Sequence, residues 1–209
     1  MRLEVWFDFI CPFCYMGKKS LEMALKETGL VGQIEVIYKS FELDPNEISD
    51  RNTSINVRLA EKYGITLEEA QKMNENVKLL AQGYGLDYYI EGMKQTNTFN
   101  THRLMKYAET KGKGREITEG LFRAYFTEGK FLDDIEVLAS LAEEVGLNRE
   151  EVLRIINSQA FSNEVRKDER QAAKLGITGV PYYLFNGKYT LSGLRDVDTL
   201  SMILKKMAG

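Results

Sequence analysis

Two cysteines separated by two residues carry the clearest chemistry in this sequence. Cys11 and Cys14 enclose Pro12 and Phe13, and they are the only cysteines among 209 residues. Residues three apart on a helix lie about 5–6 Å from each other, a separation that a disulfide can bridge. The pair can therefore alternate between dithiol and disulfide without moving the backbone, which indicates thiol-disulfide redox chemistry.

Two other interpretations of the pair remain open from the residues alone. A Cys-x-x-Cys can be half of a zinc site, but the other ligands would have to come from His102 and carboxylates, since the chain has one histidine. The cysteines can also be small core residues without a chemical role. A redox motif next to a βαβ pattern is the interpretation that this spacing favours.

The surrounding elements must place the cysteines where a strand meets a helix. Residues 3–10 form an apolar and aromatic run that predicts a strand buried on both faces, with Asp8 inside it. A helix over 13–27, with Phe13, Gly17 and Leu21 on one face, and a strand over 33–41 complete a βαβ unit with parallel strands. Unpaired N–H groups at a helix start favour a thiolate. We therefore expect Cys11 to attack and Cys14, one turn further, to resolve.

The remaining elements follow the same hydrophobic patterning. Almost everything from residue 44 to about 175 is predicted to be helical, with a loop around 83–98. Capping boxes begin at Thr66 and Asn148. Asn186-Gly187 predicts a tight hairpin between strands at 181–186 and 188–192. A helix follows the capping box at Thr66, with Ala70, Met73, Val77 and Leu80 on one face, and further helices are predicted over 98–111, 116–128, 133–145, 148–158, 163–175 and 196–207.

Composition excludes several classes of protein. With 28 basic and 31 acidic residues the net charge is −3, which argues against nucleic acid or an anionic membrane as a partner. No run of about 20 apolar residues occurs, and the N-terminus lacks the apolar segment of a signal peptide. We expect a cytoplasmic protein, where a cysteine pair is more often catalytic or metal-binding than structural.

Three segments together carry a family resemblance. They are residues 8–14 (Asp-Phe-Ile-Cys-Pro-Phe-Cys), 97–104 (Asn-Thr-Phe-Asn-Thr-His-Arg-Leu) and 175–181 (Leu-Gly-Ile-Thr-Gly-Val-Pro). The chain resembles the DsbA family of the thioredoxin superfamily, and within it the FrnE-like cytoplasmic branch. That branch is related to 2-hydroxychromene-2-carboxylate isomerase and the kappa-class glutathione transferases.

The resemblance implies an α/β thioredoxin fold with a large all-helical insertion. Residues 1–43 and 176–209 would form the thioredoxin-like domain and 44–175 the inserted helical domain. It also implies that Val180-Pro181 is a cis bond beside the cysteines, where a substrate peptide could pair with Val180 as an added strand; alternatively, Pro181 only begins a strand. Phe13 stands where periplasmic members have histidine, and it supplies neither charge nor hydrogen bond.

Two polar residues are candidates for supporting roles. Asp8 is either a buried carboxylate that relays the proton of Cys14 or a carboxylate that is solvated or caps the helix. His102 either faces the cysteine pair or is satisfied on its own helix near Asn97 or Thr98.

Two further features carry weaker expectations. The tyrosines at 84, 88 and 89 belong either to the core or to a groove for peptides or aromatic molecules. The charged run 166–170 is predicted to be a solvated helix face.

The predicted function is that of a thiol-disulfide oxidoreductase, of the oxidase, reductase or isomerase type, acting on a disulfide-containing protein or a small thiol or disulfide. No cofactor or metal is expected, with glutathione as a candidate redox partner. The alternative is a glutathione-dependent isomerase or transferase, whose branch has serine where Cys11 stands. The direction of electron flow and the oligomeric state are left open.

Overall fold

The computed structural model describes residues 1–208, and within them the chain divides into two compact units. The first unit combines residues 1–43 with the segment from Arg166 onward, and the second is Asp44–Val165. The described chain contains no helix that is both long enough and apolar enough to span a bilayer. Each unit has its own buried apolar residues.

The first unit is built on a four-stranded mixed sheet in the order β2-β1-β5-β6. Strand β1 pairs in parallel with β2, as the predicted βαβ unit requires, and antiparallel with β5. The elements of this unit are β1 (Arg2–Phe7), α1 (Pro12–Glu27), β2 (Glu35–Ser40), α8 (Ser162–Lys174, which begins in the second unit), β5 (Tyr182–Phe185), β6 (Tyr189–Ser192) and α9 (Val197–Ala208).

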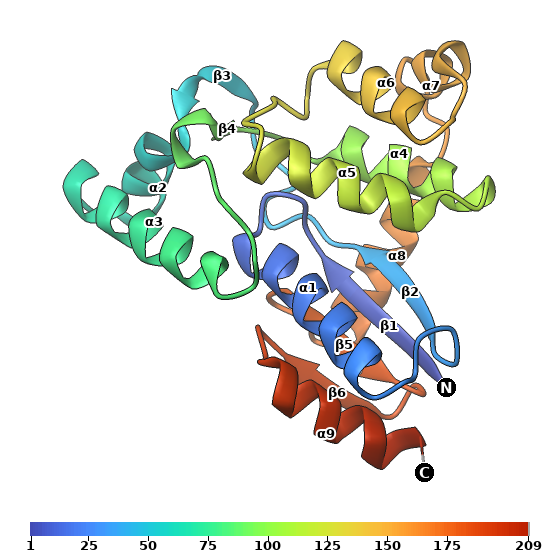
Figure 1. Ribbon diagram of the computed structural model, residues 1–209. Helices are drawn as coiled ribbons and strands as arrows, with labels where there is room; N and C mark the ends of the chain where they lie inside the picture. The colour runs from blue at the N-terminus through green and yellow to red at the C-terminus, as the bar shows by residue number, and fades with distance from the viewer. Residues whose placement is uncertain (209) are drawn as a thin grey trace. The chain divides into compact units, whose positions relative to one another are not determined.

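Helices cover both faces of this sheet. Leu3 and Val5 of β1 pack with Leu21 of α1 and Leu200 of α9 on one face, where α1 and α9 run side by side (Figure 1). Trp6, on the opposite face of β1, packs with Ala172 of α8. Because β1 is buried on both faces, the expectation from its continuous apolar run is confirmed.

The second unit is mainly helical, as predicted, and includes a small sheet that was not predicted. Its elements are β3 (Asp50–Ser54), α2 (Ile55–Tyr63), α3 (Leu67–Gln82), the short 3-10 helix η1 (Ile90–Gly92), β4 (Lys94–Gln95), α4 (Phe99–Thr110), α5 (Gly114–Phe126), α6 (Ile135–Glu144) and α7 (Arg149–Ile156). Helices α4 to α7 pack against one another, and β3 pairs antiparallel with β4. The chain therefore has the thioredoxin fold with a helical insertion that the resemblance implied.

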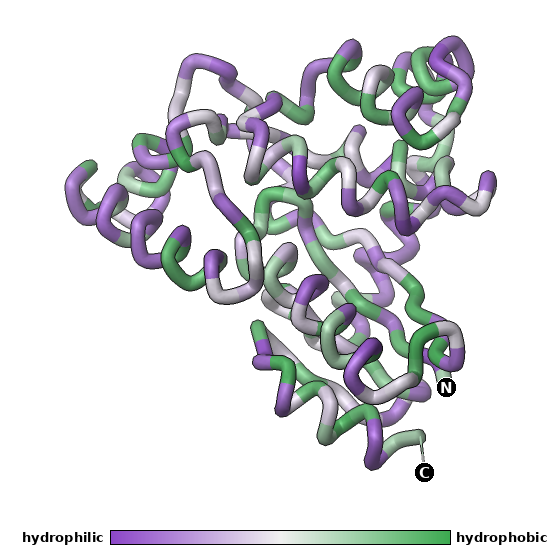
Figure 2. The backbone as a smooth tube through the Cα atoms, viewed as in Figure 1, coloured by the Kyte–Doolittle hydropathy of each residue, from purple (hydrophilic) through white to green (hydrophobic). Residues whose placement is uncertain are grey.

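Several local predictions need correction. The strand predicted over 3–10 ends at Phe7, so Asp8 lies in the following turn. Ala70 of the expected stripe is buried in helix α3, but the other buried residues are Asn74 and Ala81, and the helix is hydrophilic along most of its length (Figure 2). Met73 is 46% exposed because the buried face of α3 is rotated by one residue.

The charged run at 166–170 is also more than a solvated face. Asp168 is buried and accepts hydrogen bonds from the Lys39 Nζ (2.9 Å) and from the Ser40 backbone N–H (3.1 Å). Its own backbone carbonyl accepts a bond from Trp6 Nε1. The backbone carbonyl of Asp168 therefore anchors α8 to β1, and its side chain, which the charge pattern placed in solvent, anchors α8 to β2.

Candidate active site

Cys11 lies immediately before the first residue of α1, at the N-cap position, with Pro12 as the first helical residue. Proline suits that position because the missing N–H would have no partner within the helix. The Cys11 backbone N–H donates to the carbonyl of Asp8 (3.2 Å), and the Cys14 N–H donates to the carbonyl of Cys11 (3.0 Å). The turn after β1 thus delivers both thiols to the start of the helix.

Both cysteines are free thiols, and both are buried, at 3% and 2% exposure. Phe13 between them is 39% exposed, although the periodicity placed it on the apolar face of the helix. Burial, and next a hydrogen bond to Cys11, raise the pKa of the Cys14 thiol well above its ordinary value. Cys14 is therefore held as a neutral thiol beside Cys11.

The loop before β5 contacts Cys11. The Cys11 Sγ donates a weak hydrogen bond to the Val180 carbonyl oxygen at 3.6 Å. Val180-Pro181 is a cis peptide bond, as the resemblance implied. Pro181 is buried, and its carbonyl oxygen accepts from the Gly193 N–H at 2.8 Å. The structure thus places the cysteine pair beside Val180 and Pro181, the two distant residues that the sequence resemblance singled out.

Asp8 joins this cluster from the turn after β1. Its side chain is completely buried, which excludes the solvated carboxylate considered from sequence. The Asp8 Oδ2 accepts a hydrogen bond from the Leu43 backbone N–H at 2.8 Å. A backbone hydrogen bond from Asp8 and its charge both act on the Cys14 thiol, the first lowering and the second raising its pKa. Asp8 is therefore an immediate electrostatic neighbour of Cys14.

His102 lies in the second unit, in the first half of α4, and is completely buried. Its backbone N–H donates to the Thr98 carbonyl within the helix (2.9 Å). A role for its side chain toward the cysteines remains a prediction.

The neighbouring Arg103, part of the same sequence segment, has a structural role that sequence reasoning missed. Its guanidinium donates to the carbonyls of Ile155, Ile156, Ser158 and Ala160, and so caps the end of α7.

The tyrosines considered for an aromatic groove separate into different environments. Tyr88 is completely buried and stacks on Phe126 with ring centroids 4.6 Å apart, so it belongs to the core. Tyr89 is half exposed, and its ring lies where a Cβ at Gly92 would be. The two neighbouring rings therefore do not line one common groove.

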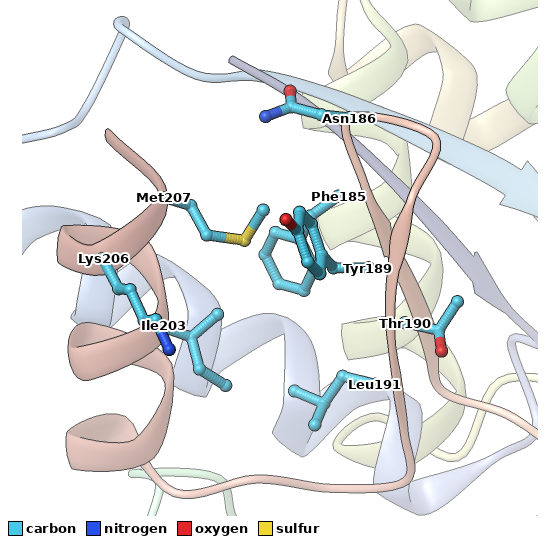
Figure 3. Close-up of a pocket in the computed structure, with 8 residues that line it drawn as sticks. All are labelled: Phe185, Asn186, Tyr189, Thr190, Leu191, Ile203, Lys206 and Met207. Carbon is cyan, nitrogen blue, oxygen red and sulfur yellow. The ribbon is translucent and has the colours of Figure 1, made fainter. Parts of the chain in front are cut away.

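A hollow of about 490 Å³ lies between the β5–β6 hairpin and α9. Met207 of α9 points toward the rings of Phe185 and Tyr189 (Figure 3). The full lining consists of Phe185, Asn186, Tyr189, Thr190, Leu191, Ile203, Lys206 and Met207. These residues supply one cation and neither a thiol nor a carboxylate.

No group of three or more His, Cys, Asp or Glu residues is arranged to hold a metal ion among residues 1–208. The half-site interpretation of the cysteine pair therefore lacks the further ligands that a zinc ion requires.

The chain is similar to several known proteins over most of its length. The family model described as "DSBA-like thioredoxin domain" matches residues 2–205. The crystal structure of a probable DsbA oxidoreductase from Streptomyces coelicolor superposes with a TM-score of 0.93 at 34% identity, covering 100% of this chain and 90% of that one.

Two curated relatives also align over most of the chain. The uncharacterized protein YwbO of Bacillus subtilis (strain 168) is 27% identical over 88% of this chain and 86% of its own. The 2-hydroxychromene-2-carboxylate isomerase of Sphingobium xenophagum is 23% identical over 86% of each. These relatives therefore represent both groups that the sequence resemblance named, the DsbA oxidoreductases and 2-hydroxychromene-2-carboxylate isomerase.

Proposed function

The chain belongs to the DSBA-like thioredoxin domain family, whose members include thiol-disulfide oxidoreductases, and from that premise we propose how this one works. Cys11 attacks a substrate disulfide, and Cys14 resolves the mixed disulfide that results. The observation that carries the proposal is the pair of free thiols at the start of α1, with the Cys11 Sγ 3.6 Å from the Val180 carbonyl.

The different surroundings of the two sulfurs support the division of roles. Cys11 sits at the N-cap, where the unpaired N–H groups of the first turn favour negative charge. Burial and the hydrogen bond to Cys11 keep Cys14 protonated. Exposure does not separate the two, since both are almost fully buried. The N-cap position of Cys11 and the raised pKa of Cys14 therefore support the proposal that Cys11 is the nucleophile.

The chemistry balances as two successive exchanges. The Cys11 thiolate attacks one sulfur of the substrate disulfide, forming a mixed disulfide and releasing the other sulfur as a thiolate. The Cys14 thiolate then attacks the Cys11 Sγ, forming the Cys11–Cys14 disulfide and releasing the second substrate thiolate. The substrate gains two electrons, the cysteine pair loses two, and the reverse sequence oxidises a dithiol.

Val180 and Pro181 are the proposed substrate-binding residues. The Val180 carbonyl already accepts from Cys11, so a backbone N–H of a bound substrate can take that position when Cys11 becomes a thiolate or is joined to substrate. An extended substrate would then lie beside the loop as an added strand. Phe13, exposed next to the pair, offers it an apolar contact.

Asp8 is the proposed proton acceptor for Cys14. It is buried, electrostatically coupled to that thiol, and held by the Leu43 N–H. Because Cys14 must lose its proton before it can attack, a neighbouring carboxylate that accepts the proton would speed resolution. Asp8→Asn should slow resolution and leave the first attack by Cys11 unchanged.

A glutathione redox titration tests the proposal. We expect a reversible two-electron transition of the Cys11–Cys14 pair, followed as the alkylated dithiol fraction by intact mass. Cys14→Ser should accumulate a mixed disulfide at Cys11, and Cys11→Ser should not. The absence of a reversible transition in the unaltered protein would refute the assignment. The same titration shows whether glutathione serves as redox partner; a disulfide-containing protein is the other proposed substrate.

The competing function is the glutathione-dependent isomerisation of the related branch. That chemistry does not require a thiol at position 11, so the Cys11→Ser variant should then retain activity. Both cysteines are present here, which favours the oxidoreductase. We place it in the cytoplasm, where the glutathione pool is available, and cell fractionation tests that location.

A further inference from the structure

Tyr183 of β5 carries a hydroxyl beside the cysteine helix that the function above does not use. The residue is completely buried and packs with Leu21 of α1. A Cβ built on Gly17 would lie 2.5 Å from the Tyr183 Oη and 3.2 Å from the Pro181 Cγ. The hydroxyl therefore lies against the backbone of α1, one turn after Cys14 and next to Pro181.

The Tyr183 Oη has no hydrogen-bond partner among residues 1–208. A buried hydroxyl without a partner destabilises a protein, whereas phenylalanine would fill the same space without burying an unsatisfied group. An unsatisfied buried polar group in a native protein calls for an explanation, and a redox or catalytic role is one such explanation. We therefore expect the Tyr183 hydroxyl to form its hydrogen bond in another state of the reaction cycle.

The charges around Tyr183 indicate which state that is. Burial, first, and then the charge of Cys14 raise the pKa of the phenol, so the hydroxyl keeps its proton and remains a donor. Tyr38 of β2 and Cys11 act in the same direction, and Arg195 opposes them. Cys14, whose own thiolate is disfavoured by burial, is the neighbouring group that must become negative during resolution.

We propose that the Tyr183 hydroxyl donates a hydrogen bond to the Cys14 thiolate as it forms in the resolving step. This inference rests on the proposed function. Tyr183 keeps its proton throughout, while the proton of Cys14 leaves to Asp8 or solvent. The Cys14 thiolate attacks the Cys11 Sγ, the Cys11–Cys14 bond forms, and the substrate thiolate departs with the electron pair. Once the disulfide has formed, the hydroxyl again lacks an anionic acceptor.

The expected effect follows from the strength of a charged hydrogen bond. Such bonds exceed neutral ones, and about a ten-fold stabilisation of the thiolate corresponds to about one pKa unit. Without this hydrogen bond, the fraction of Cys14 present as thiolate at a pH below the Cys14 pKa would fall about ten-fold. A more basic thiolate is the better nucleophile, with a Brønsted coefficient of about 0.5, so resolution should slow by only about three-fold.

The test compares Tyr183→Phe with Tyr182→Phe. Tyr182 is the neighbouring residue on the opposite face of β5, where it packs with Trp6, and it is the matched control. In a Cys11→Ala background, Cys14 is the sole cysteine, and its pKa can be read from the NMR shift of its ¹³C-labelled Cβ. We expect Tyr183→Phe to raise that pKa by about one unit and Tyr182→Phe to leave it unchanged.

Stability and kinetics separate this role from a structural one. With Cys11 present, Tyr183→Phe should slow release of the mixed disulfide about three-fold, while its Tm stays equal or rises. An unchanged Cys14 pKa, or a lower Tm as the only effect, would overturn the inference. The Cys14 titration does not depend on turnover. If the protein shows no reversible transition in the glutathione titration, the proposed function is refuted. The hydrogen bond is then still tested by the effect of Tyr183→Phe on the Cys14 pKa.

Discussion

Removing the Asp168 carboxylate should destabilise the first unit strongly, because that buried side chain joins α8 to the end of β2. It pairs with Lys39 at 2.9 Å and accepts from the Ser40 N–H at 3.1 Å, and both charged side chains are nearly buried. Breaking a buried pair by deleting one partner costs about 3–5 kcal/mol. Lys39 retains Glu4 at 3.5 Å, so we expect the lower end, about 3 kcal/mol, for Asp168→Ala.

Urea unfolding measures this directly. With a slope of about 2–3 kcal/mol/M, the midpoint for Asp168→Ala should fall by about 1–1.5 M. Asp168→Asn keeps an acceptor for Ser40 and should lose about half as much. Glu164→Ala, an exposed acidic position on the same helix, is the control and should change stability by less than about 0.5 kcal/mol. Equal losses in Asp168→Ala and Glu164→Ala would refute the reasoning, because the loss would then not depend on the buried contacts of Asp168.

Three further predictions concern other buried groups. Burial and a neighbouring carboxylate raise the pKa of Glu42 to about 8 from 4.5, so the native protein holds a proton that the unfolded chain releases. The free energy of unfolding should therefore fall as pH rises from about 5 to 8, and Glu42→Gln should flatten that slope in urea titrations; an equally steep slope in the variant would contradict this. Gly17→Ala should lower the free energy of unfolding by about 1–3 kcal/mol because its Cβ would clash with Tyr183. The control Gly120→Ala has open space at its Cβ and should raise that free energy by up to about 1 kcal/mol. Similar changes in Tm for the two variants would rule out the clash. Arg103→Lys should lower the Tm by losing the fork that caps α7, at about 2 kcal/mol, and an unchanged Tm would show that a single charge suffices.

The order of elements and the position of the cysteines could be read from local sequence. The apolar run before Cys11, the proline at the first helical position and the Asn186-Gly187 turn are short-range signals whose physics acts within a few residues. Asn186 and Gly187 both adopt positive φ, as such a turn requires. The Cys-x-x-Cys spacing likewise defines its chemistry without reference to distant residues.

The missed elements of the second unit lack such local signals. Helix α2 buries none of its residues, so no apolar stripe identifies it. Strand β3 reads Asp-Arg-Asn-Thr-Ser, without the β-branched and aromatic pattern of a strand. Its pairing with β4, about 40 residues later, is a long-range contact that composition does not encode.

The surroundings of the cysteines were decided only by tertiary structure. The burial of Asp8, the anchoring of Asp168 and the unpartnered hydroxyl of Tyr183 each arise from elements far apart in sequence that pack together. Two thiols three residues apart determine that disulfide chemistry is available. How readily Cys14 becomes a thiolate depends on desolvation and on donors that reach it from other strands, and those exist only once the chain has folded.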